Sequence, residues 1–511
     1  MLDFGPLSAA TVKGDVDAVR ALIANPESLK EVSPWGLLPL HLAVERPDVL
    51  EIILHATPSP WESMSQYDKL ELIYLALRWS GRQCRNGSAW SRCSHCHCTD
   101  SIELLVSSDG CRTFWLTNET FVITGLLYAS HASRLRVIGV VKSRRDQLKS
   151  QALGLFTPWE IDQFQLHSGK ILDFYAPQVV QRLEEHGCKV PDLRFDRGST
   201  SISVYHALTC TTWGLGGTRL ADLFLTCGFL DIDPLLDNVV TPLACALRHS
   251  RPFDYPQWLI SHGASLERCL HNPSMYHKGR GWTGAHSLFT RPDLVNQDDV
   301  CSESHSYILR DSALVARYDQ CQCPCSAQGC SPASFLIRSL FIKYPCYGGR
   351  PTRIVEWLKR HTIDFTGYSD ICMYVIRALT FEILGLRHTC CEAFPESPEL
   401  EQDEVEEIAD EQREMIAHLI ELVGEFTQDL QKTNLDFAEF LLNHWAPQIK
   451  EALAELEAVK LTEEEKRAAE SIGVKWNNET MSKKVKVRDL SPPKLKTVED
   501  YERELSKIVH G

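Results

Sequence analysis

Apolar side chains recur every three or four residues along much of the chain, which is the spacing that places them on one face of an α-helix. Two stretches near the C-terminus show this most clearly. The first contains Met415, Leu419, Leu422, Phe426 and Leu430, and the second contains Phe437, Phe440, Leu441, Trp445, Ile449, Leu453 and Leu456. Pro447 lies inside the second stretch and predicts a kink or a break there. The pattern predicts a mostly α protein whose two C-terminal helices form a hairpin. Packing of this hairpin on the preceding helices is favoured, and binding to an outside partner is the alternative.

A short pattern of apolar residues occurs twice near the N-terminus. Pro39 suits the first turn of a helix, where its missing N–H would have no partner, and Leu40 and Ala43 lie on one face of that helix. A second helix is predicted over 48–55, with buried Val49, Ile52 and Ile53. Pro6-Leu7 and Asp15-Val16 precede Pro39-Leu40 and Asp48-Val49 by the same 33 residues. The chain therefore repeats a unit of two helices.

The same unit returns in the middle of the chain. The segment Thr241-Pro242-Leu243-Ala244-Cys245-Ala246 predicts a first helix, and 203–208 predicts another before it. Three second helices end with a glycine four residues after an apolar residue, in the pairs Leu183 and Gly187, Phe224 and Gly228, and Leu259 and Gly263. Glycine suits the left-handed conformation that often ends a helix. The glycine spacings are 41 and 35 residues, so the repeats are irregular.

The segment Gly36–Ala43 resembles the ankyrin-repeat signature G-x-T-P-L-H-x-A, and 33 residues is the length of that repeat. The resemblance implies that His41 ties neighbouring repeats through backbone hydrogen bonds. Ser8 stands in the place of this histidine in the first copy, and Ala244 or Cys245 in the later one. We therefore expect a mostly α fold, an irregular ankyrin-type α-solenoid over about residues 1–270 followed by a C-terminal helical region.

Six parts are expected along the chain. They are N-terminal ankyrin repeats at 1–60, diverged repeats with a cysteine-rich insertion at 61–200, ankyrin repeats at 201–275, a cysteine-bearing connector at 276–395, an acidic start and helical hairpin at 396–474, and a basic, loosely ordered tail at 475–511.

Two clusters of cysteines carry the candidate metal chemistry. The first contains Cys93, Cys96 and Cys98, and the second contains Cys321, Cys323, Cys325 and Cys330. Structural zinc takes four thiolate or imidazole ligands. In an extended strand the sulfurs of a C-x-C segment lie ~6.6 Å apart, so the backbone must turn to share one ion, and Pro324 favours such a turn. The clusters are candidate structural zinc sites. The more ordinary alternative is a thiol-rich loop packed as small apolar side chains, and redox pairing is the third.

A second resemblance rests on the segment 321–332. Cysteine-bearing ankyrin proteins of filamentous fungi carry a C-x-C-x-C-S-x-x-G-C-x-P segment, which is matched here by Cys321, Cys323, Cys325, Ser326, Gly329, Cys330 and Pro332. The helical patterns at 422–426 and 435–453 are similar as well. The resemblance supports the expected architecture and brings no activity with it. A weaker group downstream, His388, Cys390 and Cys391, is more typical of a packed core than of a ligand set.

The charge of the chain is unevenly distributed. The 511 residues include 53 Lys and Arg and 68 Asp and Glu, a net charge of −15. Residues 396–511 hold 28 acids and 15 bases, a net charge of −13, which leaves −2 for the first 395 residues. The acidic balance argues against a protein that binds nucleic acid or anionic membranes over its whole surface. The acidic run at 396–414 is instead a candidate for contact with a basic partner or a basic face of the same chain.

The expected function is a non-enzymatic protein-binding scaffold. No nucleotide-binding, hydrolase, metalloprotease or kinase signature occurs. A repeat surface suits the binding of a protein partner, and Lys30, Glu31 and Trp35, at the tip before the second repeat, are the candidate contacts. The alternative is a zinc-dependent regulatory protein in the nucleus that reaches nucleic acid through the basic run 483–488. The N-terminus lacks a secretory-signal pattern, and no apolar run approaches the ~20 residues of a membrane helix. We therefore expect a cytoplasmic location without membrane contact, with a nuclear location as the alternative.

Overall fold

The computed structural model describes most of the chain up to residue 471. The described ranges are 4–83, 99–107, 120–167, 169–188, 203–211, 217–235, 240–249, 254–268, 282–289, 303–319, 323–343, 350–361, 363–365, 367–389, 402–433, 435–458 and 463–471. Over these ranges the secondary structure is helical, and no β-strand occurs. The chain divides into two units, Met1–Gln448 and Ile449–Gly511. Cys93, Cys96, Cys98, Cys321 and the tail 475–511 lie outside the described residues.

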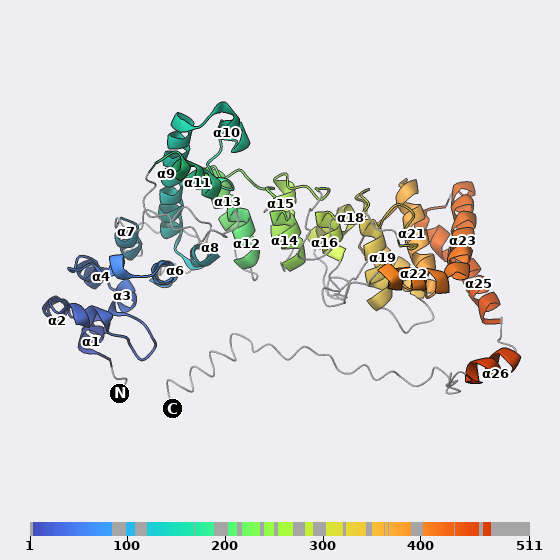
Figure 1. Cartoon of the computed structure of the whole chain (residues 1–511), viewed down its shortest axis with the longest axis horizontal. Helices are drawn as coiled ribbons and strands as arrows, with labels where there is room; N and C mark the ends of the chain where they lie inside the picture. Colours follow the sequence, from blue (N-terminus) through green and yellow to red (C-terminus); the bar gives the residue numbers. More distant parts are fainter. Residues whose placement is uncertain are drawn as a thin grey trace. The chain divides into compact units, whose positions relative to one another are not determined.

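In the first unit, one set of helices forms a row in which each helix contacts the next (Figure 1). The row consists of α1 (Pro6–Lys13), α3 (Pro39–Leu42), α6 (Gln66–Gln83), α8 (Thr120–Tyr128), α12 (Val204–Thr211), α14 (Pro242–His249), α16 (Gly284–Phe289), α19 (Pro332–Lys343), α21 (Ser369–Ile383) and α23 (Arg413–Lys432). A second row consists of α2 (Val16–Leu22), α4 (Pro47–Leu54), α7 (Asp100–Ser107), α9 (His131–Leu155), α13 (Gly217–Cys227), α15 (Asp254–Ser261) and α18 (Glu303–Ala313).

Successive helices of the chain pair across the two rows. Contacts join α1 to α2, α3 to α4, α6 to α7, α12 to α13, α14 to α15, and α16 to α18. The helix α20 (Arg350–Arg360) follows α19 and contacts it in the same way. A helix pair of this kind cannot bury its apolar faces alone, and stacking against neighbouring pairs completes the burial.

Local sequence signals set the ends of these helices. Proline occupies the first position of α1, α3, α14 and α19, where no hydrogen bond is lost. The hydroxyl of Thr241 accepts a hydrogen bond from the backbone N–H of Ala244 and so caps α14. Gly187, Gly228 and Gly263 have positive φ values of 79°, 101° and 99° after α11 (Ala176–Glu185), α13 and α15. The predicted helix ends at these glycines are confirmed.

The two N-terminal copies occupy equivalent places. Leu7 and Leu40 both follow the proline that begins a helix, and both are buried, in helices α1 and α3 that contact each other. In the second helix Val49 and Ile53 are buried as predicted, but Ile52 is only partly buried. Leu50 is buried instead, because the face turned inward lies one residue earlier than the pattern suggested.

Two histidines connect successive helix pairs. His206, in α12, uses its Nδ1 to bond the hydroxyl of Ser203 at 2.9 Å, and its Nε2 lies 3.0 Å from the carbonyl oxygen of Val240, the residue before Thr241. His286, in α16, repeats the arrangement with Thr283 at 2.9 Å and with the carbonyl oxygen of Cys330 at 3.0 Å. Because Nδ1 lies against a hydroxyl and Nε2 faces a carbonyl, the ring joins the start of its own helix to the start of the next pair.

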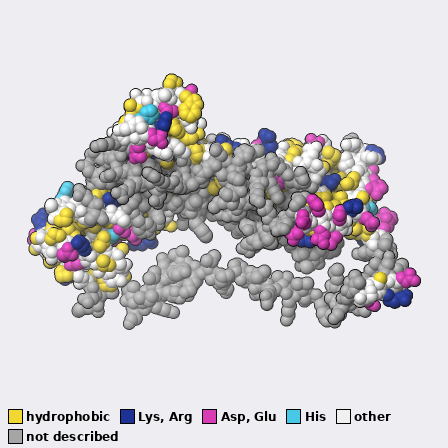
Figure 2. All heavy atoms as spheres, viewed as in Figure 1, with side chains coloured by type: hydrophobic (Ala, Val, Ile, Leu, Met, Phe, Trp, Pro, Cys, Tyr) yellow, Lys and Arg dark blue, Asp and Glu magenta, His cyan; other side chains and the backbone are white. Residues whose placement is uncertain are grey.

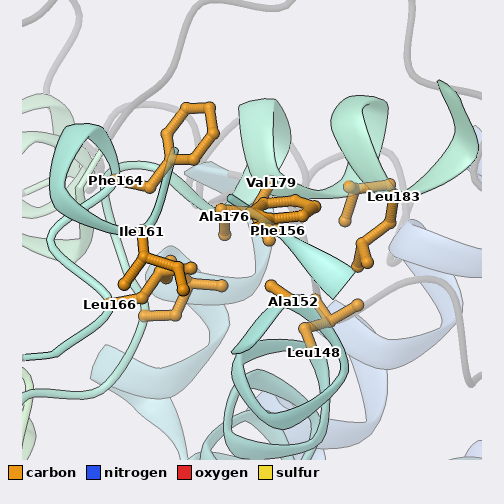
Figure 3. Close-up of a cluster of buried hydrophobic side chains, with 11 residues drawn as sticks. Leu148, Ala152, Phe156, Ile161, Phe164, Leu166, Ala176, Val179 and Leu183 are labelled. Carbon is orange, nitrogen blue, oxygen red and sulfur yellow. The ribbon is translucent and has the colours of Figure 1, made fainter. Parts of the chain in front are cut away.

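The stacking continues through the part of the chain expected as a connector. The segment 276–395 supplies α16, α18, α19, α20 and α21, and α14, α16, α19 and α21 contact one another in sequence. The segment 61–200 likewise supplies α6, α7, α8 and α9 to the rows. It also carries α10 (Pro158–Gln163) and α11, which close an apolar cluster over α9 (Figure 3). Leu148 and Ala152 of α9 pack in this cluster against Val179 and Leu183 of α11.

The C-terminal helices of the first unit pack on the end of the rows. After α23 the chain forms α24 (Phe437–Phe440), the π-helical turn η5 (Leu441–Trp445) and α25 (Ala446–Ala458), which runs into the second unit. Trp445 donates a hydrogen bond from Nε1 to the hydroxyl of Thr380 in α21 at 3.1 Å, and α23 contacts α21. The packed arrangement is therefore confirmed for the described residues of the first unit. The helix is not broken at Pro447. Just before it, the N–H of Ala446 bonds the carbonyl of Leu441, so the irregularity at this place is a π-helical turn.

Acidic side chains gather over α22 (Gln402–Glu411), which precedes and contacts α23 (Figure 2). The second unit contains the remainder of α25 and α26 (Glu463–Ser471). None of the described helices combines the length and the apolar character that a membrane span requires.

Acidification is expected to weaken the stack through the linking histidines. Burial lowers the pKa of His206 and of His286 to about 4, against 6.5 for a free histidine, while hydrogen bonding to Val240 and Cys330 opposes the shift in each case. The unfolded chain therefore binds more protons between these values, so stability is full above pH 6.5 and is lost as the pH falls toward 4, by up to about 3 kcal/mol for each histidine.

Urea unfolding measured from pH 7 to pH 5 tests this expectation. His286→Gln should be less stable at pH 7 and should lose stability less steeply as the pH falls. His167→Gln, on a side chain that is 68% exposed, is the control. An identical pH dependence in wild-type protein and His286→Gln contradicts the proposed role of the histidine.

Candidate functional site

Three buried or partly buried side chains converge between α18 and α21. Cys323 and Cys325 lie in the segment before α19, and His388 lies just after α21. One ligand atom from each lies within 4.8 Å of the others, so the group could hold a metal ion. The Cys323 sulfur is 3.9 Å from Nδ1 of His388. The sulfur of a fourth residue, Cys330, is 3.5 Å from that of Cys325.

The loop that carries the cysteines is held by backbone and side-chain hydrogen bonds. The N–H of Ser326 donates to the carbonyl of Cys323 at 3.1 Å, which is the turn that the C-x-C spacing required. The N–H of Cys330 donates to a carboxylate oxygen of Asp319 at 2.6 Å, and the N–H of Asp319 donates to the carbonyl of Cys330 at 3.0 Å. Ser326 also donates its hydroxyl proton to the carbonyl of Gly329. These bonds hold all three sulfurs on the buried side of the loop, where they are 2–3% exposed.

Gly329 is the one residue in this loop that must be glycine. Its φ is +110°, a conformation that side chains with a Cβ rarely adopt. A Cβ there would also lie 1.9 Å from the carbonyl oxygen of Asp319. The loop can therefore close on Asp319 only because position 329 has no side chain.

Charged groups surround the cluster and orient the histidine. Nε2 of His388 lies 2.6 Å from a carboxylate oxygen of Glu382, which leaves Nδ1 facing the thiols. Burial alone would lower the pKa of His388, but hydrogen bonds to Cys323 and Glu382 outweigh it and raise the pKa. Arg377 donates from Nε to the carbonyl of Pro324 at 2.8 Å, and burial lowers its pKa while Cys325 and Cys323 oppose that shift. A carboxylate behind a ligating histidine is the common support of metal-bound imidazole.

The donor set fits a thiophilic metal ion. Thiolate and imidazole are ligands of Zn²⁺, whereas Mg²⁺ and Ca²⁺ take oxygen ligands. Two sulfurs on one tetrahedral zinc ion lie ~3.8 Å apart, and the Cys325 and Cys330 sulfurs are 3.5 Å apart. Cys323, Cys325 and His388 can therefore share one ion. The sulfur of Cys330 lies beside that of Cys325 but outside this group of three, so it would have to move closer to serve as the fourth ligand.

The sequence nominated the cysteines of this site and not its histidine. It nominated Cys321, Cys323, Cys325 and Cys330, and the structure brings the last three together, while Cys321 lies outside the described residues. It placed His388 in a weaker group more typical of a core than of a ligand set, and the structure puts the imidazole of this partly buried residue beside the thiols, where it could supply a nitrogen ligand. Cys323 and His388 are 65 residues apart, with the three helices α19, α20 and α21 between them, so no short motif could connect them. Cys93, Cys96 and Cys98, together with Cys390 and Cys391, lie outside the described residues.

Two of the three candidate partner contacts, Lys30 and Trp35, are exposed at the tip. Lys30, at the end of η1 (Pro26–Lys30), is exposed and pairs with Glu27 at 2.8 Å. Trp35 is 59% exposed and rests edge-on against Phe4, with ring centroids 5.2 Å apart.

Glu31 has a different role. One of its carboxylate oxygens accepts hydrogen bonds from the backbone N–H groups of Leu7 and Ser8, each at 3.1 Å. These amides belong to the first turn of α1, whose N–H groups have no partner within the helix. A negative charge is stabilising there. Glu31 therefore caps α1, and its role as a partner contact stays a prediction.

No protein-family model and no curated protein matches the chain. The resemblances to ankyrin repeats and to cysteine-bearing fungal proteins therefore stay predictions from the sequence motifs.

Replacing Gly329 is expected to disrupt the metal centre. Gly329→Ala combines a left-handed backbone with the clash against Asp319, so it should reduce bound metal and lower the melting temperature. Gly263→Ala is the matched control, because Gly263 has a φ of +99° and no atom within 4 Å of its notional Cβ. The control should cost only the backbone strain, about 1 kcal/mol. Equal melting temperatures and equal metal content in the two variants would refute the role given to Gly329.

Proposed function

We propose that this chain is a non-enzymatic, protein-binding scaffold built on ankyrin-type repeats. The single observation that carries the fold part of the proposal is the repeated histidine link. In both His206 and His286 the ring sits three residues after a capping Ser or Thr and bonds the carbonyl before the next capping residue. This is the role that the ankyrin resemblance implies for the signature histidine.

The same register identifies the matching position in α14. His206 and His286 lie three residues after Ser203 and Thr283, and the corresponding position after Thr241 is Ala244. Of the two candidates left open by the sequence, Ala244 and Cys245, the first is therefore the one that replaces the histidine. An ankyrin-type α14 would accommodate a histidine at this place, with the carbonyl of Trp282 as its partner.

Restoring the signature histidine tests the repeat type. Ala244→His is expected to raise the melting temperature by a few degrees, since it adds a link worth about 1 kcal/mol. Ala207→His, at a buried alanine of α12 that is not in the signature position, should lower it by inserting a polar ring without partners. A lower melting temperature for Ala244→His, as low as that of Ala207→His, would argue against ankyrin-type stacking.

The binding part of the proposal follows from the architecture. A row of stacked helix pairs presents a long, nearly continuous surface, and such surfaces serve as extended binding sites. Exposed Lys30 and Trp35 lie at the tip between the first two pairs. Recovery of the full chain from its native cells, with crosslinking and mass spectrometry, tests this directly. We expect a stoichiometric protein partner crosslinked to residues of the first unit. Recovery of the chain alone would contradict the scaffold function.

We further propose that Cys323, Cys325, Cys330 and His388 hold a structural zinc ion. Four buried or half-buried protein ligands are typical of a closed structural site, whereas a catalytic site keeps one position for water or substrate. When bound, the ion would supply a crosslink between the loop before α19 and the segment after α21. The alternative of a zinc-dependent protein acting on nucleic acid depends on the basic run 483–488, which lies outside the described residues.

Metal analysis of purified protein tests the zinc site. Cys325→Ser and His388→Ala are each expected to lose about one equivalent of zinc relative to the wild type, and a chelator should then no longer lower their melting temperature through this site. Cys188→Ser, at a half-buried cysteine packed beside α9 and α11, controls for the loss of a thiol. Unchanged zinc content in both variants would rule out these residues as ligands.

A further inference from the structure

A groove lies at the N-terminal end of the rows, between α1, the tip that carries Trp35, the turn η2 (Ala43–Glu45) and α6. Its volume is about 380 Å³. Apolar side chains line it, among them Leu37, Leu75 and Trp79. Val12 and Trp35, also in its lining, are 47% and 59% exposed. The groove thus combines exposed apolar side chains with a polar rim, which is a common make-up of binding sites.

Three arginines surround the apolar lining. Arg46 follows η2, and Arg78 and Arg82 lie one turn apart on α6, so they share a face of that helix. Within the described part of the chain, none of the three guanidinium groups forms an ion pair or a hydrogen bond, whereas their backbone groups are bonded in the turn and the helix. Glu45 is the one acidic side chain in the lining. The groove therefore presents guanidinium groups that no internal carboxylate neutralises.

Buried polar atoms in the lining also lack partners. The hydroxyl of Thr11 and Nε2 of His41 are buried, and neither has a hydrogen-bond partner among the described residues. Nδ1 of His41 accepts a hydrogen bond from the N–H of Leu38 at 3.3 Å. Burial lowers the pKa of His41, opposed chiefly by Glu71, so the ring is neutral and its proton is on Nε2. The equivalent atoms of His206 and His286 have carbonyl partners at 3.0 Å. Nε2 of His41 makes no hydrogen bond of that length, and the backbone of Asp68 is the polar group that acts on the ring and raises its pKa.

We infer that this groove binds an acidic, extended segment of a partner protein, with an apolar or aromatic side chain placed against Trp35, Leu75 and Trp79 and carboxylates paired with Arg46, Arg78 and Arg82. The inference rests on the proposed scaffold function and names the chemistry of its partner. Planar guanidinium groups bind carboxylates in two-pronged pairs. Tryptophan and arginine also supply most of the binding energy in protein interfaces.

Nucleic acid is the less fitting occupant. A single strand would need a positive groove that follows its backbone, with bases stacked on successive aromatic rings. The lining of this groove holds three positively charged side chains, all arginines, and no lysine. The apolar part of the lining, with Leu37, Leu75 and Trp79, suits a buried side chain better than a hydrated phosphate chain.

Fluorescence anisotropy on the full-length protein tests the inference. The probe is a short labelled peptide with a central Leu-Trp flanked by glutamates, and the matched probes carry glutamines or lysines at the flanks. A labelled single-stranded oligonucleotide is the fourth probe. We expect the glutamate probe to bind most tightly, with an affinity that falls as salt is added. Absence of binding, or equal binding of the glutamine probe, would overturn the inference, as would stronger binding of the oligonucleotide at the same site.

Two matched pairs of variants locate the site. Arg78→Glu with Arg82→Glu should lower the affinity for the glutamate probe about tenfold or more. The control, Arg20→Glu with Arg136→Glu, makes the same charge change at exposed arginines outside the groove. It should leave the affinity within about twofold of the wild-type value. Trp35→Ala should weaken it about tenfold, and Trp159→Ala, at a 70% exposed tryptophan of α10, should not. Unchanged melting temperatures confirm that each variant is folded. Equal losses in both arginine pairs would mean attraction by overall charge and would overturn the site.

The outcome is separable from that of the scaffold function. If a partner is recovered from cells and is retained by the Arg78→Glu, Arg82→Glu protein, the scaffold stands and the inference about its partner fails. If no partner is recovered at all, the scaffold function itself fails, irrespective of the affinities measured for the peptide probes.

Discussion

The hydrogen bond from a buried histidine to the first carbonyl of the next helix pair is the contact on which the stack depends. Each helix pair is too small to bury its apolar faces alone, so its stability comes from its neighbours. Apolar packing between neighbours has little direction, whereas the histidine bond joins two defined atoms. His206 and His286 therefore set the register in which one pair follows the next. Burial keeps these rings neutral, which is the form in which Nδ1 can accept while Nε2 donates.

The candidate metal centre is built into one of these junctions. Cys330 accepts the hydrogen bond of His286 with its carbonyl, donates its N–H to Asp319, and places its sulfur beside that of Cys325. The residue that receives the link between helix pairs is thus also a candidate metal ligand. An ion held there would stabilise the same junction that the histidine aligns, and would add His388 from beyond α21. The cysteine loop and the histidine link therefore meet at the same junction between helix pairs.

The N-terminal end of the rows differs from the interior in the hydrogen bonds of its polar groups. Glu31 caps the first helix from the tip of the next pair, so the chain supplies its own closure there. Nε2 of His41 makes no hydrogen bond as short as those of His206 and His286. The terminal surface consequently combines exposed Trp35 with unneutralised arginines, where the interior of the rows has packed side chains.

The sequence by itself determined the local features. Prolines marked the first positions of helices, glycines marked their ends, and the apolar spacing identified the C-terminal hairpin, because each of these signals acts within a few residues. It also nominated Cys323, Cys325 and Cys330, which share one short loop. Only the tertiary structure decided which residues distant in sequence meet. His388 lies beside the thiol of Cys323, 65 residues away. The carboxylate of Glu31 caps the first helix. The two rows of helices extend through residues 276–395. Those contacts depend on how irregular connections position successive helices, and the sequence carries no fixed spacing from which that positioning can be inferred.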